Sequence, residues 1–312
     1  MRAFTFPGQG SQAVGMGQAL AEAFPAARHV FQEIDDALSE KLSKLIFEGP
    51  VEELTLTQNA QPALMAVSLA ALRAIESEGR TSLGAIAAYV AGHSLGEYSA
   101  LAAAGALGVA DTARLLRIRG LAMQKAVPVG EGAMAAVLGL DLDTVNAVVE
   151  EARGADVLAT ANDNGVGQVV ISGTKAAVDR AIDLAKAKHG KRAMLLPVSA
   201  PFHCPLMQPA ADAMAEALEG AIIAPPAVPL IANVTAAPTS DPETIRRLLV
   251  EQVTGLVRWR ETVLKLAELQ VTTLVEAGAG KVLTGIAKRI VPDAAAVVVN
   301  APADVEAFLK TL

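Results

Sequence analysis

Residues 92–96 read Gly-His-Ser-Leu-Gly, the spacing G-x-S-x-G. Between a strand and a helix this spacing is typical of a nucleophile elbow, because the glycines permit a tight turn that projects the serine hydroxyl. Apolar residues 85–91 predict a buried strand before it, and residues 95–104 predict a helix after it. Ser94 is therefore a candidate nucleophile, and the N–H of Leu95 a candidate oxyanion donor. The alternative is an ordinary turn in which Ser94 caps the helix.

A nucleophilic serine needs a general base, and the chain has four histidines: His29, His93, His189 and His203. His29 and His189 fall on polar or basic parts of predicted helices, which are solvated positions. His93 is directly beside Ser94, where neighbouring side chains diverge. His203 follows a strand predicted over residues 192–198, in a loop, where catalytic groups gather. Elimination selects His203 as the base; the alternative is a structural loop histidine.

Arg119 lies in a helix predicted over residues 111–125. At about 100° per residue it falls inside the apolar stripe of that helix, whereas Arg114 and Arg117 fall on other faces. Burying an unpaired guanidinium is costly, so Arg119 needs an anionic partner. That partner is either a carboxylate of the protein or a carboxylate of the substrate, which the arginine fork would grip with two hydrogen bonds. Spacing alone leaves both open.

Other motifs carry weaker signals. Residues 8–13 match the dinucleotide pattern G-x-G-x-x-A, but Asp35 and Asp36 fall in a helix, so the acid that should end a second strand is missing. Residues 278–281 lack the first glycine of a phosphate loop and its following Ser or Thr, and predict a tight strand-to-helix turn. Cys204 is interpreted as a passive thiol beside His203, because adjacent residues rarely meet productively.

Composition narrows the class of protein. At roughly 150 residues per domain, 312 residues suggest about two folding units, and 52% hydrophobic residues supply a sizeable core. A net charge of −7 argues against a nucleic-acid partner. A single cysteine excludes an internal disulfide and a cysteine-rich zinc site. The chain start does not resemble a secretory signal, and no apolar run reaches the ~18 residues of a membrane helix, so we expect a cytoplasmic protein with no membrane partner.

Strands and helices alternate along most of the chain, which favours an α/β fold with helices packed on a mostly parallel sheet. Between residues 128 and 197 the predicted order is strand, helix, strand, strand, helix, strand, as in a ferredoxin-like unit. Because the flanking segments form one larger domain, we interpret this block as an insertion. The expected division is a large domain of residues 1–127 and 198–312 and a small subdomain of residues 128–197.

Several segments occur in a characteristic order: residues 6–12, 92–100, 119–120 with 123–124, 168–173, 201–207 and 281–285. Their sequences are FPGQGSQ, GHSLGEYSA, RG with MQ, QVVISG, PFHCPLM and KVLTG. Each is weak alone, but the ordered set is specific and spans nearly the whole chain. By these residues the chain resembles the malonyl-CoA:acyl carrier protein transacylases of fatty-acid synthesis.

The resemblance implies an α/β-hydrolase-like large domain with an inserted ferredoxin-like (βαββαβ) small subdomain. It implies Ser94 as nucleophile, His203 as base, Gln9 and Leu95 as backbone oxyanion donors, Arg119 as the malonyl carboxylate partner, and Gln252 as the residue that orients the histidine. The role of Gln252 would belong to its main-chain carbonyl, so its side chain need not matter; this carbonyl would replace the third acid of a triad. The bulky Phe202 would favour malonyl over methylmalonyl groups.

The implied reaction moves malonyl from malonyl-CoA to the phosphopantetheine thiol of acyl carrier protein through a malonyl-serine, supplying extender units for fatty-acid synthesis. No metal or nucleotide cofactor is implied. Carrier proteins are acidic and this chain is itself negative, so docking would need a local basic patch. Candidates are Lys288 with Arg289, or the basic run in residues 186–192; the alternative for both is a solvated helix face.

Three other functions stay open at this point. A serine hydrolase such as a thioesterase would use the same serine and histidine with water as acceptor. A transacylase could serve polyketide synthesis or malonate decarboxylation instead of fatty-acid synthesis. A non-catalytic module that only binds carrier protein would need neither Ser94 nor His203.

Overall fold

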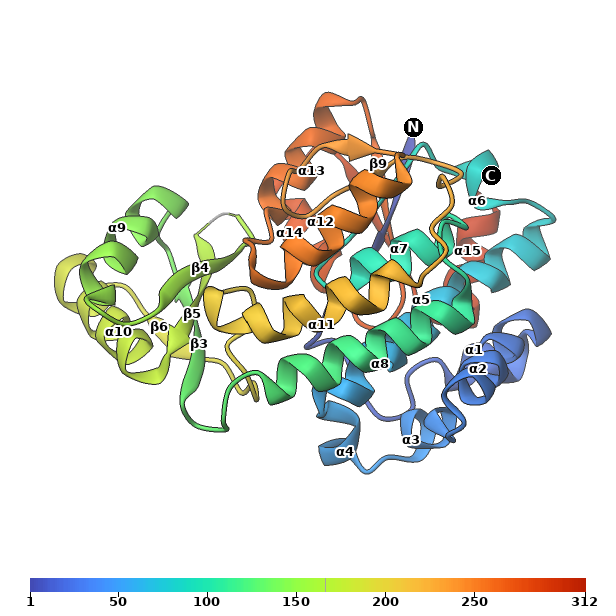
Figure 1. Cartoon of the computed structure of the whole chain (residues 1–312). Coiled ribbons are helices and arrows are strands. Elements are labelled where there is room, and N and C mark those ends of the chain that lie inside the picture. The colour runs from blue at the N-terminus through green and yellow to red at the C-terminus, as the bar shows by residue number, and fades with distance from the viewer. Residues whose placement is uncertain (166) are drawn as a thin grey trace.

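The computed structural model describes residues 1–165 and 167–312, which form two sheets and the helices around them (Figure 1). The strands are β1 (Arg2–Phe6), β2 (Tyr89–Gly92), β3 (Gly132–Leu138), β4 (Leu158–Asp163), β5 (Gln168–Thr174), β6 (Ala193–Leu195), β7 (Leu230–Ile231), β8 (Pro238–Thr239), β9 (Thr273–Ala277) and β10 (Ala295–Val299). The helices up to the small sheet are α1 (Gln18–Ala23), α2 (Pro25–Leu38), α3 (Leu42–Glu48), α4 (Val51–Thr55), α5 (Thr57–Gly79), α6 (Leu83–Ile86), α7 (Gly96–Ala103) and α8 (Val109–Lys125). The later helices are α9 (Leu142–Arg153), α10 (Lys175–His189), the short 3-10 helix Pro205–Met207, α11 (Gln208–Glu219), α12 (Pro242–Thr254), α13 (Trp259–Glu268), α14 (Val282–Ile290) and α15 (Pro302–Leu309).

The larger sheet has helices on both faces, as an α/β fold requires. Its order is β10-β9-β1-β2-β7-β8, and every pair is parallel except β7 with β8. Side chains alternate across β1: Phe4 packs in the core that contains α5, whereas Ala3 packs with Trp259 of α13 on the other face. The predicted α/β class and mostly parallel sheet are confirmed.

The carboxyl ends of parallel strands meet at one edge of the sheet, and this edge carries several of the candidate site residues. β1, β2 and β7 are neighbours in the sheet. The loops that follow them carry Gln9, Ser94 and Asn233 respectively. Residues far apart in the sequence are therefore brought together at the edge where α/β proteins bind ligands.

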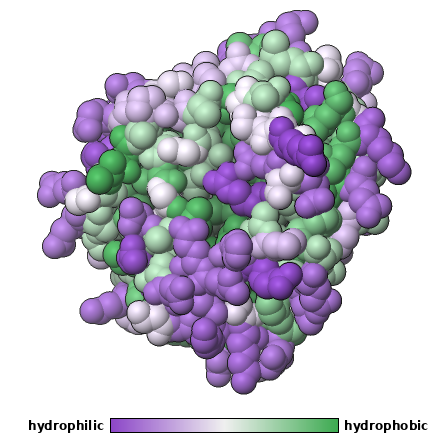
Figure 2. All heavy atoms as spheres, turned by 90° about the vertical axis from the view of Figure 1, so that its right-hand side faces the viewer, coloured by the Kyte–Doolittle hydropathy of each residue, from purple (hydrophilic) through white to green (hydrophobic). Residues whose placement is uncertain are grey.

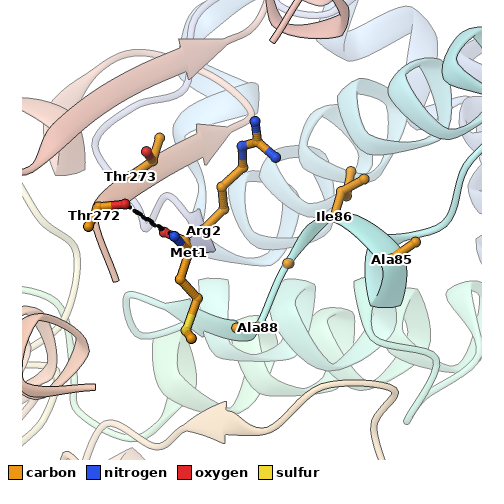
Figure 3. A pocket seen from close by; sticks show the side chains of 8 residues that line it. Met1, Arg2, Ala85, Ile86, Ala88, Thr272 and Thr273 are labelled. Atoms are coloured by element: carbon orange, nitrogen blue, oxygen red, sulfur yellow. Dashed lines mark hydrogen bonds between the residues drawn. The ribbon is translucent and has the colours of Figure 1, made fainter. Parts of the chain in front are cut away.

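The opposite edge has a hollow of about 480 Å³ at the amino ends of β1 and β9, between Met1, Ala85 and Thr273 (Figure 3). Its labelled side chains bring no cluster of titratable groups together: the amino group of Met1 donates to Thr272 Oγ1 at 3.1 Å, and Arg2 instead donates to the carbonyl of Thr311. This hollow therefore offers no acid–base chemistry.

The smaller sheet lies to the left in Figure 1, with α9 and α10 packed on it. Its order is β4-β5-β3-β6, and all its pairs are antiparallel. The chain order β3-α9-β4-β5-α10-β6 matches the predicted order of elements. One end of β4 is fastened to the larger part, since Asp163 N donates to Val257 O at 3.0 Å and Arg260 Nε lies 2.8 Å from Asp163 Oδ2.

Two predicted strands are longer than the observed ones. The strand expected over residues 85–91 begins only at Tyr89, because its pairing with β1 starts at Ala3, and residues 83–86 form α6 instead. The strand expected over residues 192–198 covers only Ala193–Leu195. Pro197, two residues further on, has no N–H with which to continue a ladder.

Polar and apolar side chains intermingle on the face at the right of Figure 1, which Figure 2 shows head-on. Such scattered apolar residues are usual for a protein surface. Across residues 1–165 and 167–312, no helix combines the length and the apolar character needed to cross a membrane.

Candidate active site

Ser94 occupies a strained turn between β2 and α7. Its backbone angle φ is 54°, in the left-handed region that residues other than glycine rarely adopt. A Cβ on Gly92 would collide with the carbonyl of Gly96, and a Cβ on Gly96 would collide with the carbonyl of Phe6. Both glycines of the motif are therefore required by close backbone packing, as expected of a nucleophile elbow.

Asn233, in the loop that follows the neighbouring strand β7, holds this turn in place. Its Oδ1 accepts the N–H of Ser94 at 2.8 Å, and its Nδ2 donates to Gly92 O at 2.7 Å. The side chain thus bridges both sides of the elbow and offsets part of the cost of the strained residue. Asn233 was not among the residues predicted from the sequence, where the available signal was an amide residue just beyond a short apolar segment.

Ser94 and His203 are within hydrogen-bond distance, and the surroundings determine which ring nitrogen carries the proton. Ser94 Oγ lies 2.7 Å from His203 Nε2. His203 Nδ1 lies 2.9 Å from the main-chain oxygen of Gln252, which can only accept. Nδ1 must then donate, which leaves Nε2 as the acceptor for the serine hydroxyl. This is the tautomer that a general base needs.

The environment keeps His203 neutral. Its side chain is buried, and desolvation together with the positive charge of Arg119 lowers the pKa of His203 to about 3. The carbonyl of Gln252 acts in the opposite direction but does not outweigh burial. A neutral imidazole beside the hydroxyl can accept its proton.

Arg119 is 1% exposed, which confirms its predicted place on the core face of its helix. Its Nη1 donates to Gln61 Oε1 at 3.0 Å, and its Nη2 donates to Gln252 Oε1 at 2.7 Å and to Ser94 Oγ at 3.2 Å. Among the described residues no carboxylate forms an ion pair with it. Burial lowers the pKa of Arg119, against the charge of Glu97 and other groups. Gln61 was also not predicted as a site residue, although a polar residue within an apolar helical segment was a signal in the sequence.

Besides its main-chain contact with His203, Gln252 has side-chain contacts within the site. Its Oε1 accepts from Arg119, while its Nε2 donates to Ser94 O at 2.9 Å and to a carboxylate oxygen of Glu97. Its main chain and its side chain therefore hold two different groups of the site. This double use could not be inferred from the sequence, because it depends on where α12 lies.

A cavity of about 430 Å³ opens beside these groups, a size typical of small-molecule sites. Residues from both parts of the molecule line it, including Gln9, Ser94, Leu95, Arg119, Met134, Asn162, Val198, Phe202 and His203. Among the described residues, the N–H groups of Gln9 and Leu95 have no hydrogen-bond acceptor. The cavity is therefore lined by Ser94 and by two residues, Gln9 and Leu95, whose main-chain N–H groups are free to donate a hydrogen bond.

Other candidate residues lie elsewhere. Lys288 and Arg289 are exposed in the last turn of α14, where Arg289 donates to Gln168 Oε1 at 3.1 Å. His29 and His189 are exposed. Cys204 is buried and its thiol donates to the carbonyl of Pro201 at 3.1 Å, so it is not in contact with the serine.

This arrangement has what acyl transfer through a serine ester would require: a hydroxyl beside a neutral imidazole, with two free N–H groups on residues of the same cavity. Comparison with known proteins gives the family. The sequence profile of the acyl transferase domain matches residues 3–310. The malonyl CoA-acyl carrier protein transacylase of Bacillus subtilis (strain 168) is 46% identical over 99% of this chain and 96% of its own length, and that of Escherichia coli (strain K12) is 45% identical over 99% and 98%.

Solved structures agree. The acyl-carrier-protein-S-malonyltransferase of Bartonella henselae is 58% identical, with a TM-score of 0.97 over 99% of this chain and 98% of that one. A malonyl-transacylase in complex with its type II PKS acyl-carrier protein is 44% identical, with a TM-score of 0.95 over 100% and 99%. The chain belongs to the acyl transferase family, and within it to the malonyl-CoA:acyl carrier protein transacylases.

The low pKa of His203 predicts how the reactivity of Ser94 depends on pH. Labelling of Ser94 by a neutral fluorophosphonate should keep a nearly constant rate from pH 8 to pH 5, because the base stays unprotonated well above a pKa of about 3. A histidine with its ordinary pKa near 6.5 would lose about 30-fold over that range. Intact mass would measure the rate, with Ser94→Ala as the unlabelled control. An inflection near pH 6.5 would contradict the prediction.

Proposed function

We propose that this chain transfers the malonyl group from malonyl-CoA to the phosphopantetheine thiol of acyl carrier protein. One observation carries the substrate assignment: a guanidinium without a carboxylate partner among the described residues lies 3.2 Å from the nucleophilic hydroxyl, inside a cavity. A buried cation so close to the serine suits an acyl group with its own carboxylate a few bonds from the reacting carbonyl. The names of the similar proteins support the same substrate pair.

We assign roles as follows. His203 takes the proton of Ser94, whose oxygen attacks the thioester carbonyl of malonyl-CoA. The N–H groups of Gln9 and Leu95 stabilise the negative oxygen of the tetrahedral intermediate. The carbon–sulfur bond then breaks, His203 returns its proton to the sulfur, and coenzyme A leaves a malonyl-serine ester.

The second half reverses these steps with another thiol. The phosphopantetheine thiol of the carrier gives its proton to His203 and attacks the ester carbonyl. The carbon–oxygen bond to Ser94 breaks, and the hydroxyl regains its proton from the imidazolium. The carbonyl of Gln252, 2.9 Å from Nδ1, holds the ring in one tautomer throughout and takes the place of a third acid.

Arg119 accounts for selectivity in this proposal. A malonyl carboxylate would form charge-assisted hydrogen bonds with the guanidinium, whereas an acetyl or long acyl group would leave the cation unpaired. Phe202 is 8% exposed and borders the cavity, where its ring would leave less room for the extra methyl of a methylmalonyl group.

We also propose the finer description of the fold. The sheet order β6-β3-β5-β4 with two helices supports a ferredoxin-like small subdomain at residues 128–197. The parallel sheet and the elbow after β2 support an α/β-hydrolase-like large domain built from residues 1–127 and 198–312. The cavity lies where residues of the two parts meet.

Intact mass tests the reaction directly. Incubation with malonyl-CoA should add one malonyl group, and acyl carrier protein should then discharge it. Ser94→Ala should form no adduct. Free malonate released at the same rate without carrier protein would show a hydrolase instead, and neither adduct nor turnover would show a binding module.

Arg119→Ala should weaken malonyl loading far more than acetyl loading. Losing the charge-assisted pair should lower kcat/KM for malonyl-CoA by about 10²-fold or more, while acetyl-CoA should change by less than about tenfold. Rates of serine acylation with each thioester give the ratio. Equal losses on both would contradict the selectivity role.

The proposed carrier surface is the exposed pair Lys288 and Arg289. Reversing both charges should raise KM for carrier protein several-fold, because an acidic partner would lose its local attraction. Loading from malonyl-CoA should not change. Reversal of Lys186 and Lys191 serves as the matched comparison, because it alters charge on the other candidate patch. An unchanged KM after Lys288 and Arg289 reversal would remove this surface.

A further inference from the structure

Glu97 is a buried acid next to the elbow that has no part in the mechanism above. It is the second residue of α7 and is 1% exposed. Its carboxylate accepts from Gln252 Nε2 and, at 3.3 Å, from the N–H of Asn233. Among the described residues no lysine or arginine forms an ion pair with it. Its nearest strong donor is thus a neutral amide.

That amide stands between Glu97 and Arg119. Gln252 turns its oxygen to Arg119 Nη2 at 2.7 Å and its nitrogen to Glu97. The opposite orientation would set NH₂ against a guanidinium and oxygen against a carboxylate, which is repulsive on both sides. The carboxylate and the guanidinium therefore determine together which way the amide points.

The charges of Glu97 and Arg119 also interact across this amide, because each favours the ionised form of the other. Burial raises the pKa of Glu97 to about 7, while the bonds from Gln252 and Asn233 and the charge of Arg119 oppose the increase. A direct ion pair would occupy the fork of Arg119 with a carboxylate of the protein. With one amide between them, the ionised form of Glu97 offsets part of the charge of Arg119, and the guanidinium still lines the cavity.

We propose that Glu97 is a positioning residue that acts through the side chain of Gln252 to orient Arg119 toward the carboxylate of the acyl group. The proposal rests on the proposed function, because it assumes a substrate with a carboxylate. Among the described residues the carboxylate of Glu97 has no hydrogen bond to Ser94 Oγ or His203, and its N–H bond to Ser94 O belongs to the main chain. A change of this carboxylate should therefore affect the recognition of the acyl carboxylate more than the reactivity of the serine.

The test compares Glu97→Gln with the wild-type protein in three reactions: loading from malonyl-CoA, loading from acetyl-CoA, and labelling by a fluorophosphonate. At pH 8, above the pKa of about 7 of Glu97, the substitution keeps the shape of the side chain and removes its negative charge. We expect kcat/KM for malonyl-CoA to fall by about 10- to 100-fold, mostly through KM. Acetyl loading and labelling should change by less than about threefold. A merely structural role would lower all three together.

Two more variants separate loss of this bridge from a general effect of removing a buried charge or of poor folding. Glu276→Gln neutralises another buried acid, which caps α14 and lies outside the site, and should leave all three reactions within about twofold. Gln252→Met breaks the same bridge while retaining the main-chain carbonyl that holds His203. Because it also removes the bond from Gln252 Nε2 to Ser94 O, it should slow all three reactions, but the malonyl-to-acetyl ratio should still fall even if Glu97→Gln folds poorly. The double variant should lose no more than the stronger single variant, because both remove one connection.

The outcomes separate the two proposals. If the wild-type protein loads no malonyl group, the proposed function fails and this inference fails with it. If the wild type loads malonyl but Glu97→Gln and Gln252→Met keep its malonyl-to-acetyl ratio, or lose all three reactions equally, the positioning role is overturned and the proposed function stands.

Discussion

Gln252 holds both the imidazole of His203 and the guanidinium of Arg119, which lie beside the hydroxyl of Ser94. Its main-chain oxygen is 2.9 Å from His203 Nδ1 and its side-chain oxygen is 2.7 Å from Arg119 Nη2. The residue sits in α12, so the position of this helix sets the histidine tautomer and the guanidinium direction at once. A displacement of α12 would disturb His203 and Arg119 together. The helix is held in the main core by Ile245, Leu249 and Val253.

The elbow depends on a different constraint, the close approach of β2, α7 and β1. Glycines at 92 and 96 permit that approach, and the cost is a left-handed serine with φ 54°. His203 has φ 56°, so both proposed reacting residues have strained backbones. Each has support from elsewhere in the chain: Asn233 bonds the N–H of Ser94, and Gln252 bonds the ring of His203.

Sequence reasoning located the parts of the site that local patterns encode. Ser94 follows from a five-residue motif, Arg119 from helical periodicity, and His203 from elimination among few histidines. Their supporting residues depend on contacts between distant segments: Asn233 lies 139 positions from Ser94 and was not found. The predicted start of β2 was wrong for the same reason. The pairing register with β1 decides where β2 begins, and no local sequence pattern encodes that register. Gln252 is the mixed case, because resemblance pointed to its main chain and gave no reason to consider its side chain.

The small sheet contributes a wall of the cavity, so its attachment matters for the shape of the site. The end of β4 is fixed by the 3.0 Å bond from Asp163 N to Val257 O and by the ion pair of Asp163 with Arg260. His93 Nε2 lies 2.9 Å from Asn164 Oδ1 and so connects the same segment to the elbow itself. Asn162, one residue before Asp163, borders the cavity. The wall is therefore connected directly to the turn of Ser94, and hydrogen bonds as well as packing between the two parts set its distance from that serine.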